Sequence, residues 1–308
     1  MRLLYCGTPI DAVAPMLALH EAGHELVLVL TQPDRRRGRG SATMASPVRA
    51  AAEELGLPVL TPERAVDALD ALRASGAELG VVVAFGQLLV PDVLDALPLG
   101  FVNLHFSLLP RWRGAAPVER AILAGDAETG VSLMRLEAGL DTGPVYAAVA
   151  TPIGETETAG ELRERLRVLG TELLVRELPT LTDREPVPQT GMHIKADKVT
   201  VEEFRLDPRR DASELLRMVR AGNPRPGAWT TIEGARLKVL RAHVEVSGEG
   251  PTVPIGTIDA AARLGTATGL LAFDEVQPEG KRVMPAPAWL AGRPTGTDGR
   301  VERTVDLP

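Results

Sequence analysis

The chain has 308 residues, of which 44% are hydrophobic and 24% are charged, which is typical of a folded protein with room for two domains. No apolar run approaches the length of a membrane span, and a single cysteine, Cys6, excludes a disulfide framework and a cysteine-based zinc site. The net charge of −7 argues against general affinity for nucleic acids, and an aromatic content of 3% argues against binding by stacking on a row of aromatic side chains. We expect a cytoplasmic protein, with Cys6 a small buried hydrophobe and with the N-terminal apolar residues forming a first strand rather than a signal peptide.

Strands and helices alternate through the first 106 residues. Short apolar strands are predicted at residues 2–6, 25–31, 57–60, 78–86 and 100–106. Helical spacing of apolar residues predicts helices at 9–22, 47–56 and 62–75. Ser46 is the expected cap of the second helix, and residues 32–46, rich in Gly and Arg, are expected to be a long loop. This alternation predicts a doubly wound α/β sheet, in which ligands bind beyond the carboxyl ends of the strands.

The pattern of predicted elements changes after the long helix that ends at Leu178. A helix ending at Gly125, two strands within 129–153 and a helix from Thr158 to Leu178 are predicted first. Prolines without a clear period then indicate a linker, and after a helix at 211–222 short strands broken by Gly and Pro indicate a small β-barrel. We therefore expect three parts: residues 1–180 as an α/β domain, 181–203 as a linker and 204–308 as a β-barrel domain.

Charge is distributed unevenly between these parts. Residues 204–308 hold 15 Lys and Arg against 13 Asp and Glu, whereas residues 1–203 hold 19 against 28. One basic cluster, RRRGR at residues 35–39, interrupts the acidic part. The C-terminal part therefore carries a slight positive excess while the N-terminal part is acidic.

Two polar side chains interrupt the last apolar strand of the predicted sheet. Asn103 and His105 stand two residues apart, so their side chains share one face, roughly 7 Å apart. An Asn at a strand end can donate to a carbonyl oxygen that gains negative charge, and a His can move a proton at neutral pH. Asp141 is the best carboxylate to orient the imidazole, since Gly139 and Gly143 beside it permit close backbone approach. The three together are suited to acyl transfer onto an amine without a protein nucleophile.

Other interpretations of these residues stay open at this point. A lone Asn and His near a strand end are more often a satisfied hydrogen-bonding pair than a catalytic one. A metal site is less favoured, since no second ligand lies at suitable spacing nearby. A serine hydrolase using Ser107 would lack the G-x-S-x-G elbow, and GTP at residues 7–9 lacks the G-x-G-x-x-G pattern of a dinucleotide site.

Residues 103–145, NLHFSLLPRWRGAAPVERAILAGDAETGVSLMRLEAGLDTGPV, resemble the formyltransferase family that uses 10-formyltetrahydrofolate. The family pattern is Asn-x-His-x-Ser-Leu-Leu-Pro followed downstream by an Asp in a D-x-G turn, and its counterparts here are Asn103, His105, Ser107–Pro110 and Asp141. The stretches SLLPRWRGAAP, GDAETGVS, TQPDRRRGRG, ASPV and VVVAFGQLL are similar to the branch of the family that acts on tRNA. The resemblance covers the N-terminal domain fully and the C-terminal one more loosely.

The resemblance implies a Rossmann-like formyltransferase domain followed by an OB-like β-barrel that holds tRNA. It implies that the enzyme moves the formyl group of 10-formyltetrahydrofolate, without a metal, to the α-amino group of methionine on initiator tRNA for translation initiation. Asn103 and His105 are implied to stabilise the oxyanion and manage the proton, with Asp141 supporting His105. The implied folate contacts are Ser107, Leu108, Leu109, Pro110, Phe85, Gly86, Gln87 and Leu88. The implied tRNA contacts in the basic cluster are Arg36, Arg37 and Arg39.

Three departures from the family pattern concern the tRNA contacts. SAT follows GRG where family members often carry lysines, Arg225 stands where many have Trp, and MHIKADK lacks a frequent tyrosine. The alternatives are a formyltransferase that acts on a sugar amine or small amino acid, and a non-catalytic RNA-binding protein. We expect a monomer with no membrane or DNA partner.

Overall fold

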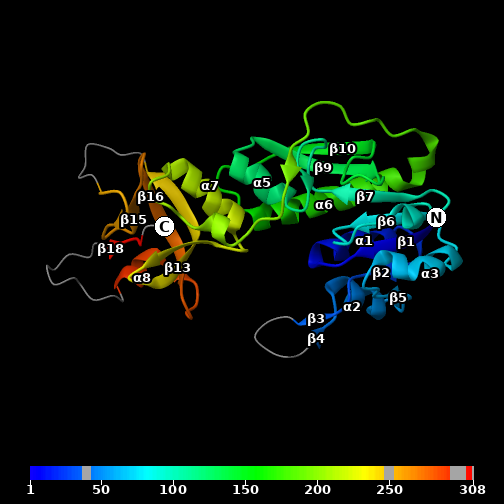
Figure 1. The fold of residues 1–308 in the computed structure, drawn as a ribbon, viewed down its shortest axis with the longest axis horizontal. Helices are drawn as coiled ribbons and strands as arrows, with labels where there is room; N and C mark the ends of the chain where they lie inside the picture. Colours follow the sequence, from blue (N-terminus) through cyan, green and yellow to red (C-terminus); the bar gives the residue numbers. More distant parts are fainter. Residues whose placement is uncertain (37–42, 246–252, 292–302, 307–308) are drawn as a thin grey trace. The chain divides into compact units, whose positions relative to one another are not determined.

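The computed structural model describes residues 1–36, 43–245, 253–291 and 303–306 (Figure 1). These residues form two compact units, each built from more than one stretch of chain. Unit 1 comprises Met1–Pro117, Glu128–Pro152 and Arg163–Ala196. Unit 2 comprises Val118–Ala127, Ile153–Leu162 and the described residues from Asp197 onwards. The division expected from the sequence, with boundaries near residues 180 and 204, stays a prediction.

The helices follow the expected order along the chain. The α-helices are α1 (Val13–Glu21), α2 (Pro47–Glu54), α3 (Leu69–Ala74), α4 (Pro91–Leu94), α5 (Pro117–Ala124), α6 (Ala159–Glu177), α7 (Ala212–Gly222) and α8 (Ala286–Ala291). Short 3-10 helices cover Ile10–Ala12, Ala65–Ala68, Leu178–Asp183 and Glu202–Phe204. The expected cap of α2 is confirmed, because the Ser46 hydroxyl accepts a 3.0 Å hydrogen bond from the Arg49 amide. No helix in the described ranges is both long and apolar enough to cross a membrane.

Unit 1 contains a seven-stranded sheet with the order β10-β9-β7-β6-β1-β2-β5 (Figure 1). Its strands are β1 (Arg2–Gly7), β2 (Glu25–Leu30), β5 (Val59–Leu60), β6 (Leu79–Val83), β7 (Phe101–His105), β9 (Glu128–Arg135) and β10 (Val145–Pro152). The five strands from β5 to β7 are parallel, while β9 and β10 are antiparallel to their neighbours. The strand order reverses between β1 and β6, which confirms the doubly wound Rossmann-like prediction and marks the expected ligand edge.

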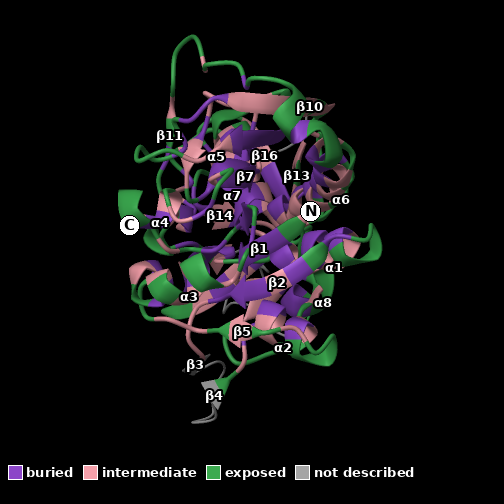
Figure 2. Cartoon of the chain, turned by 90° about the vertical axis from the view of Figure 1, so that its right-hand side faces the viewer, coloured by how far each residue is buried: buried purple, intermediate pink, exposed green. Residues whose placement is uncertain are grey.

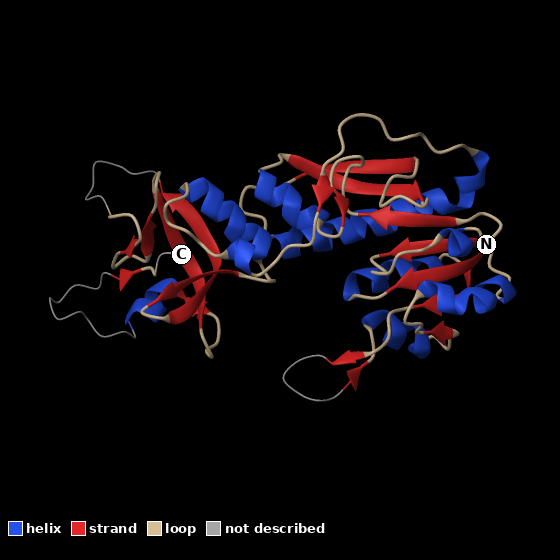
Figure 3. Cartoon of the chain, viewed as in Figure 1, coloured by secondary structure: helices blue, strands red, loops and turns tan. Residues whose placement is uncertain are grey.

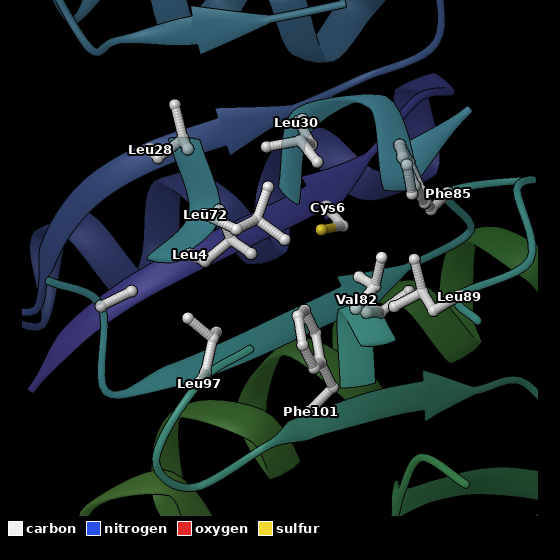
Figure 4. Close-up of a cluster of buried hydrophobic side chains, with 14 residues drawn as sticks. Leu4, Cys6, Leu28, Leu30, Leu72, Val82, Phe85, Leu89, Leu97 and Phe101 are labelled. Carbon is white, nitrogen blue, oxygen red and sulfur yellow. The ribbon is translucent and has the colours of Figure 1, made fainter. Parts of the chain in front are cut away.

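One face of this sheet packs against α3 and α4. Leu4 and Cys6 of β1, together with Phe101 of β7, point into a cluster of buried side chains (Figure 4). A Cβ atom on Gly80 would lie 2.1 Å from the Phe101 ring, so only glycine fits under that ring. Burial raises the pKa of the Cys6 thiol, which behaves as the buried hydrophobe expected from the sequence.

The opposite face of the sheet is covered by α1 and α6. The Tyr5 hydroxyl donates a 2.5 Å hydrogen bond to the Ala12 carbonyl at the start of α1. Gly170 of α6 lies against Leu104 of β7, since a Cβ there would be 2.9 Å from the leucine side chain. Figure 2 shows β1, β2 and β7 buried, whereas α1 and α2 present exposed outer surfaces. Helices therefore cover both faces, as a buried parallel sheet requires.

Short strand pairs occur where the sequence shows no period. The segment expected to be a loop at 32–46 contains an antiparallel pair of short strands, β3 (Arg35–Arg36) and β4 (Thr43–Met44). In addition, β8 (Arg113–Gly114) pairs in parallel with β11 (Lys195–Ala196). The prediction of a long loop was therefore wrong at Arg35–Arg36 and Thr43–Met44, because strands of two residues are too short to show an alternating pattern.

The sheet of unit 2 closes on itself. Its order is β12-β13-β16-β15-β14-β18, and β17 also pairs with β16. The strands are β12 (Ala228–Ile232), β13 (Ala235–Glu245), β14 (Thr257–Ile258), β15 (Arg263–Gly265), β16 (Leu270–Pro278), β17 (Met284–Pro285) and β18 (Arg303–Thr304), shown in Figure 3. Ile232 bridges Val305, the residue after β18, so the first and last strands of the order meet. This closure confirms the predicted β-barrel, in which β12 and β13 form an antiparallel hairpin.

Candidate active site

Strand β7 carries Asn103 and His105 to the ligand edge of the sheet. Its five residues are all buried, and Asn103 lies opposite Val82 of β6 and Met134 of β9. His105, the last residue of the strand, lies opposite Ser132. The two polar side chains share the face that Phe101 also occupies, since side chains alternate along a strand. The structure therefore places both residues near the end of a central strand, as expected.

His105 has a different partner at each ring nitrogen. Nε2 lies 2.9 Å from the carbonyl oxygen of Trp112, and Nδ1 lies 3.7 Å from Oδ2 of Asp141. A carbonyl oxygen only accepts hydrogen bonds, so this contact assigns the proton of the neutral imidazole to Nε2. The lone pair then resides on Nδ1, on the side of the Asp141 carboxylate.

Asp141 is held by the backbone of the segment that follows Trp112. The Gly114 amide donates a 2.8 Å hydrogen bond to Oδ2 of Asp141, and Asp141 itself is 9% exposed. Its φ of +50° lies in the left-handed region, which Asp tolerates better than most residues. A Cβ on Gly143 would lie 1.9 Å from the Arg135 carbonyl, so the close approach expected at this glycine-rich turn does occur there.

The side-chain amide of Asn103 is uncommitted. Asn103 is 9% exposed, yet its amide makes no hydrogen bond to another residue in the described part of the chain. A buried amide without a protein partner is available to donate to a ligand oxygen. Asn103 therefore differs from a satisfied structural Asn.

Ser107 supports the loop that follows β7. Its hydroxyl donates a 2.6 Å hydrogen bond to the Arg111 carbonyl, and its own carbonyl accepts a 2.7 Å bond from the Ser132 hydroxyl. The Leu109 amide donates to the same Ser132 oxygen at 3.2 Å. Ser107 is fully buried with its hydroxyl engaged, which argues against a serine nucleophile. Leu108, Leu109 and Pro110 remain half-buried at the surface of this loop.

The loop after β6 lies beside the point where the strand order reverses. The Phe85 carbonyl accepts hydrogen bonds from the Thr8 hydroxyl at 2.8 Å and from Nε2 of Gln32 at 3.0 Å. The Phe85 side chain is buried in the core cluster (Figure 4). Gly86 has a φ of +79°, and Leu88 is 69% exposed.

Gln87 is the remaining residue of this loop. Only one of the two polar atoms of its side-chain amide has a hydrogen-bond partner among the described residues. Its Nε2 donates a 2.9 Å hydrogen bond to the Pro62 carbonyl. Its Oε1 is buried and has no partner among the described residues. An unpaired buried acceptor is costly, so it is a candidate contact for a ligand N–H group.

Of the three arginines expected to contact tRNA, the structure describes the backbone of only one. Arg36 belongs to β3, while Arg37 and Arg39 lie outside the described residues. No group of three or more His, Cys, Asp or Glu within the described ranges has the arrangement of a metal site.

Two residues of the site were missed by the sequence reasoning. Gly114, which binds the Asp141 carboxylate through its amide, lies four residues after Pro110, within the stretch SLLPRWRGAAP. Gln189 donates from Nε2 to the carbonyls of Asp141 and Gly143, and it lies 48 residues from Asp141 in sequence. Nothing in the local pattern around Gln189 indicated this contact.

Comparison with known proteins agrees with this geometry. A family model described as formyl transferase matches residues 1–178, and one described as formyl transferase, C-terminal domain, matches residues 198–294. The methionyl-tRNA formyltransferase of Thermus thermophilus is 48% identical over 295 residues, which cover 95% of this chain and 96% of that protein. The methionyl-tRNA formyltransferase of Thermobifida fusca is 44% identical over 308 residues, covering 97% of this chain and 99% of that protein.

A solved structure shares the fold at lower identity. HypX from Aquifex aeolicus, in complex with tetrahydrofolic acid, superposes with a TM-score of 0.65 at 20% identity and covers 95% of this chain and 47% of that one. Together with the family matches in both parts of the sequence, these similarities leave one assignment: the chain belongs to the formyl transferase family.

Proposed function

We propose that this protein transfers the formyl group of 10-formyltetrahydrofolate to the α-amino group of methionine on initiator tRNA, giving formylmethionyl-tRNA. The observation that carries this proposal is 48% identity to a methionyl-tRNA formyltransferase across 95% of the chain, through both family domains. The Asn103, His105 and Asp141 cluster supplies the chemistry that such a transfer needs. A non-catalytic RNA-binding protein would have no use for that cluster.

Asn103 is the oxyanion donor in this proposal. When the methionine amine attacks the formyl carbon, negative charge develops on the formyl oxygen. The Asn103 amide has no protein partner among the described residues, so it can donate to that oxygen without breaking another bond. Losing one such donor typically costs about 10²–10³ in rate.

His105 moves the proton of the attacking amine. Because Nε2 is held by the Trp112 carbonyl, Nδ1 is the atom that takes the proton. The imidazolium that forms is stabilised by Asp141, whose Oδ2 lies 3.7 Å from Nδ1. The proton is then returned to the folate nitrogen that leaves. The amine attacks the formyl carbon directly, so no covalent enzyme intermediate is required, and the Ser107 hydroxyl is occupied by the Arg111 carbonyl.

The folate is proposed to lie between the loops that follow β6 and β7. These strands are adjacent and parallel, so both loops emerge at the same edge of the sheet. In this proposal Leu108, Leu109 and Pro110, all half-buried, give apolar surface from one loop, and Gly86, Gln87 and Leu88 contribute contacts from the other. The unpaired Oε1 of Gln87 suits an amino-substituted pteridine ring, which carries N–H donors. Ser107 holds one of these loops through its hydrogen bonds, and Phe85 holds the other through its buried side chain.

The proposed tRNA contacts rest on the distribution of positive charge along the sequence. Arg36, Arg37 and Arg39 add positive charge to an otherwise acidic domain, and the β-barrel carries the slight positive excess. Contacts of this kind to phosphates make binding sensitive to salt. We further propose a cytoplasmic monomer that has no membrane or DNA partner.

The decisive experiment offers the purified protein several amines. Each reaction contains 10-formyltetrahydrofolate and one acceptor: initiator methionyl-tRNA, elongator methionyl-tRNA, free methionine or an amino sugar. We expect formylation of the initiator tRNA above all others, and His105→Ala is expected to lower that rate by about 10²–10⁴. Absence of formylmethionyl-tRNA, or preference for a small amine, would overturn the proposal.

A further inference from the structure

We propose that Gln189 is a positioning residue for formyl transfer, whose amide fixes the two segments that contact the two nitrogens of His105. This inference rests on the function proposed above and assigns a role in it to a residue outside the family motif. Gln189 is half-buried, and its hydrogen bonds go to Arg113 and to the turn that carries Asp141, so it acts on His105 through these neighbours.

The Gln189 amide uses its full hydrogen-bonding capacity. Nε2 donates to the Asp141 carbonyl at 2.9 Å and to the Gly143 carbonyl at 2.7 Å. Oε1 accepts from Nε of Arg113 at 3.0 Å and from Nη2 of Arg113 at 2.8 Å. A primary amide has two N–H donors and two acceptor sites, so none remains free. One side chain thus joins the turn that carries Asp141 to the segment that carries Arg113.

These two segments are the ones that define the surroundings of His105. The residue before Arg113 supplies the carbonyl next to Nε2, and Asp141 supplies the carboxylate 3.7 Å from Nδ1. Asp141 has a left-handed φ of +50°, a conformation that the surrounding structure must maintain. The two hydrogen bonds from Gln189 end on the Asp141 carbonyl and on the carbonyl two residues later. They therefore restrain the part of the backbone that sets the direction of the carboxylate.

The segment that carries Gln189 is itself fixed on both sides. Before it, Val187 and Val145 exchange two backbone hydrogen bonds of 2.8 Å each. After it, the Ile194 carbonyl accepts from the Arg113 amide at 3.0 Å. The amide is therefore presented by an anchored backbone, and its contacts do not depend on a free loop.

Two substitutions of Gln189 separate its donor contacts, to the carbonyls of Asp141 and Gly143, from its acceptor contacts to Arg113. Gln189→Leu removes all four hydrogen bonds at similar volume. Gln189→Glu keeps acceptors for Arg113 but cannot donate to the carbonyls of Asp141 and Gly143. We expect both variants to lower kcat for methionyl-tRNA by about 10- to 100-fold, because a small misplacement of catalytic groups costs that much. The KM values for tRNA and for folate are expected to stay within about threefold, because the proposed role of Gln189 includes no contact with either substrate.

A double-mutant cycle with Asp141→Asn decides whether Gln189 acts through Asp141. If it does, Gln189→Leu has little further effect on kcat in the Asp141→Asn background. Gln277→Leu is the matched control, since Gln277 also donates from Nε2 to a carbonyl, that of Lys281 at 3.1 Å, on an exposed turn of unit 2. That variant is expected to keep the kcat of the parent enzyme.

The outcomes are distinguishable from failure of the proposed function. Inactivity of the unmodified protein on methionyl-tRNA would remove the function, whereas only the variants bear on Gln189. A parental kcat in Gln189→Leu would overturn the inference. So would a loss in the Asp141→Asn background as large as in the parent. If Gln189→Leu does not fold, Gln189→Glu gives the same readouts, and a parental kcat there equally overturns it.

Discussion

The Gly114 amide donates a 2.8 Å hydrogen bond to the same carboxylate oxygen of Asp141 that faces the imidazole of His105. The backbone amide of Gly114 thus sets the direction of that oxygen. Gly114 belongs to β8, whose backbone is held by its pairing with β11. Gly114 has a φ of +130°, and a Cβ there would lie 2.7 Å from the Ala196 carbonyl oxygen. The position therefore admits glycine only, for reasons of both conformation and space.

Gly114→Ala is expected to damage catalysis more than its loss of stability explains. The new methyl group pushes against the Ala196 carbonyl, which shifts the amide that binds Asp141. We expect kcat to fall about 10- to 100-fold and the free energy of unfolding to fall by about 1–2 kcal/mol. Steady-state kinetics and urea unfolding measure the two effects.

Gly56→Ala is the matched control for that experiment. Gly56 also has a left-handed φ, +67°, but a Cβ there would meet no atom within 4 Å, and Gly56 follows α2 away from the site. It is expected to lose about 1 kcal/mol of stability while kcat is unchanged. If Gly114→Ala likewise retained its kcat, the proposed role of the Gly114 amide would be wrong.

Asn103→Ala is expected to lower kcat by about 10²–10³ with little change in either KM, because the amide acts on charge that develops only in the transition state. Asn103→Asp has nearly the same shape but cannot donate when ionised, and its negative charge opposes the oxyanion. We therefore expect it to lose more activity than Asn103→Ala. Measuring kcat and both KM values tests this; a higher kcat for Asn103→Asp than for Asn103→Ala would contradict the oxyanion role.

The sequence located those parts of the site that depend on local pattern. A continuous apolar stretch identified β6, and an apolar stretch interrupted by two polar residues identified β7. The two-residue period of a strand then placed Asn103 and His105 on one face. The cap at Ser46 was equally local. The doubly wound order followed from the alternation of strands and helices, since right-handed crossovers leave few topologies.

The remaining contacts depend on segments that meet only in the folded chain. Asp141 was expected beside His105 from its glycine-rich turn alone, but the antiparallel pairing of β9 with β7 that brings this turn to β7 is not encoded locally. Gly114 and Gln189 reach Asp141 through β8, β11 and the Val187 bridge, each one or two residues long. Pairings this short have no period to detect, so they could not be predicted from the pattern.

Glu161 gives unit 2 a pH-dependent stability. Hydrogen bonds from the Thr158 amide, then from Arg241 and from the Thr158 hydroxyl, lower the pKa of Glu161 to about 2. Because the folded pKa lies below the ordinary 4.5, the stabilisation is complete above pH 4.5 and is lost as the pH falls toward 2. The side chain is 48% exposed, so solvent screening keeps the contribution modest.

Glu161→Gln is therefore expected to lower the free energy of unfolding by about 1 kcal/mol at pH 7 and by less at pH 3. Urea unfolding at the two pH values measures the difference. Glu172→Gln, at an exposed position of the same helix, is expected to change neither value. An equal loss at both pH values would mean that the charge of Glu161 contributes nothing.

Gly86→Ala tests the loop proposed to face the folate. Gly86 has a φ of +79°, and a Cβ there would lie 2.3 Å from Nε2 of Gln32, the atom that donates to the Phe85 carbonyl. Alanine displaces that donor and releases the loop. We expect the KM for 10-formyltetrahydrofolate to rise about tenfold, equivalent to about 1.4 kcal/mol, while the KM for tRNA is unchanged.

Gly100→Ala supplies the comparison for this last variant. Gly100 has a φ of +65°, but the nearest atom to its Cβ would be the Leu94 carbonyl oxygen at 3.8 Å, and it precedes β7 at the opposite edge of the sheet. It therefore carries the same backbone strain without crowding and without a folate loop. If both glycine variants raised the KM for folate equally, the effect would come from general destabilisation, and the loop after β6 would have no place in the folate site.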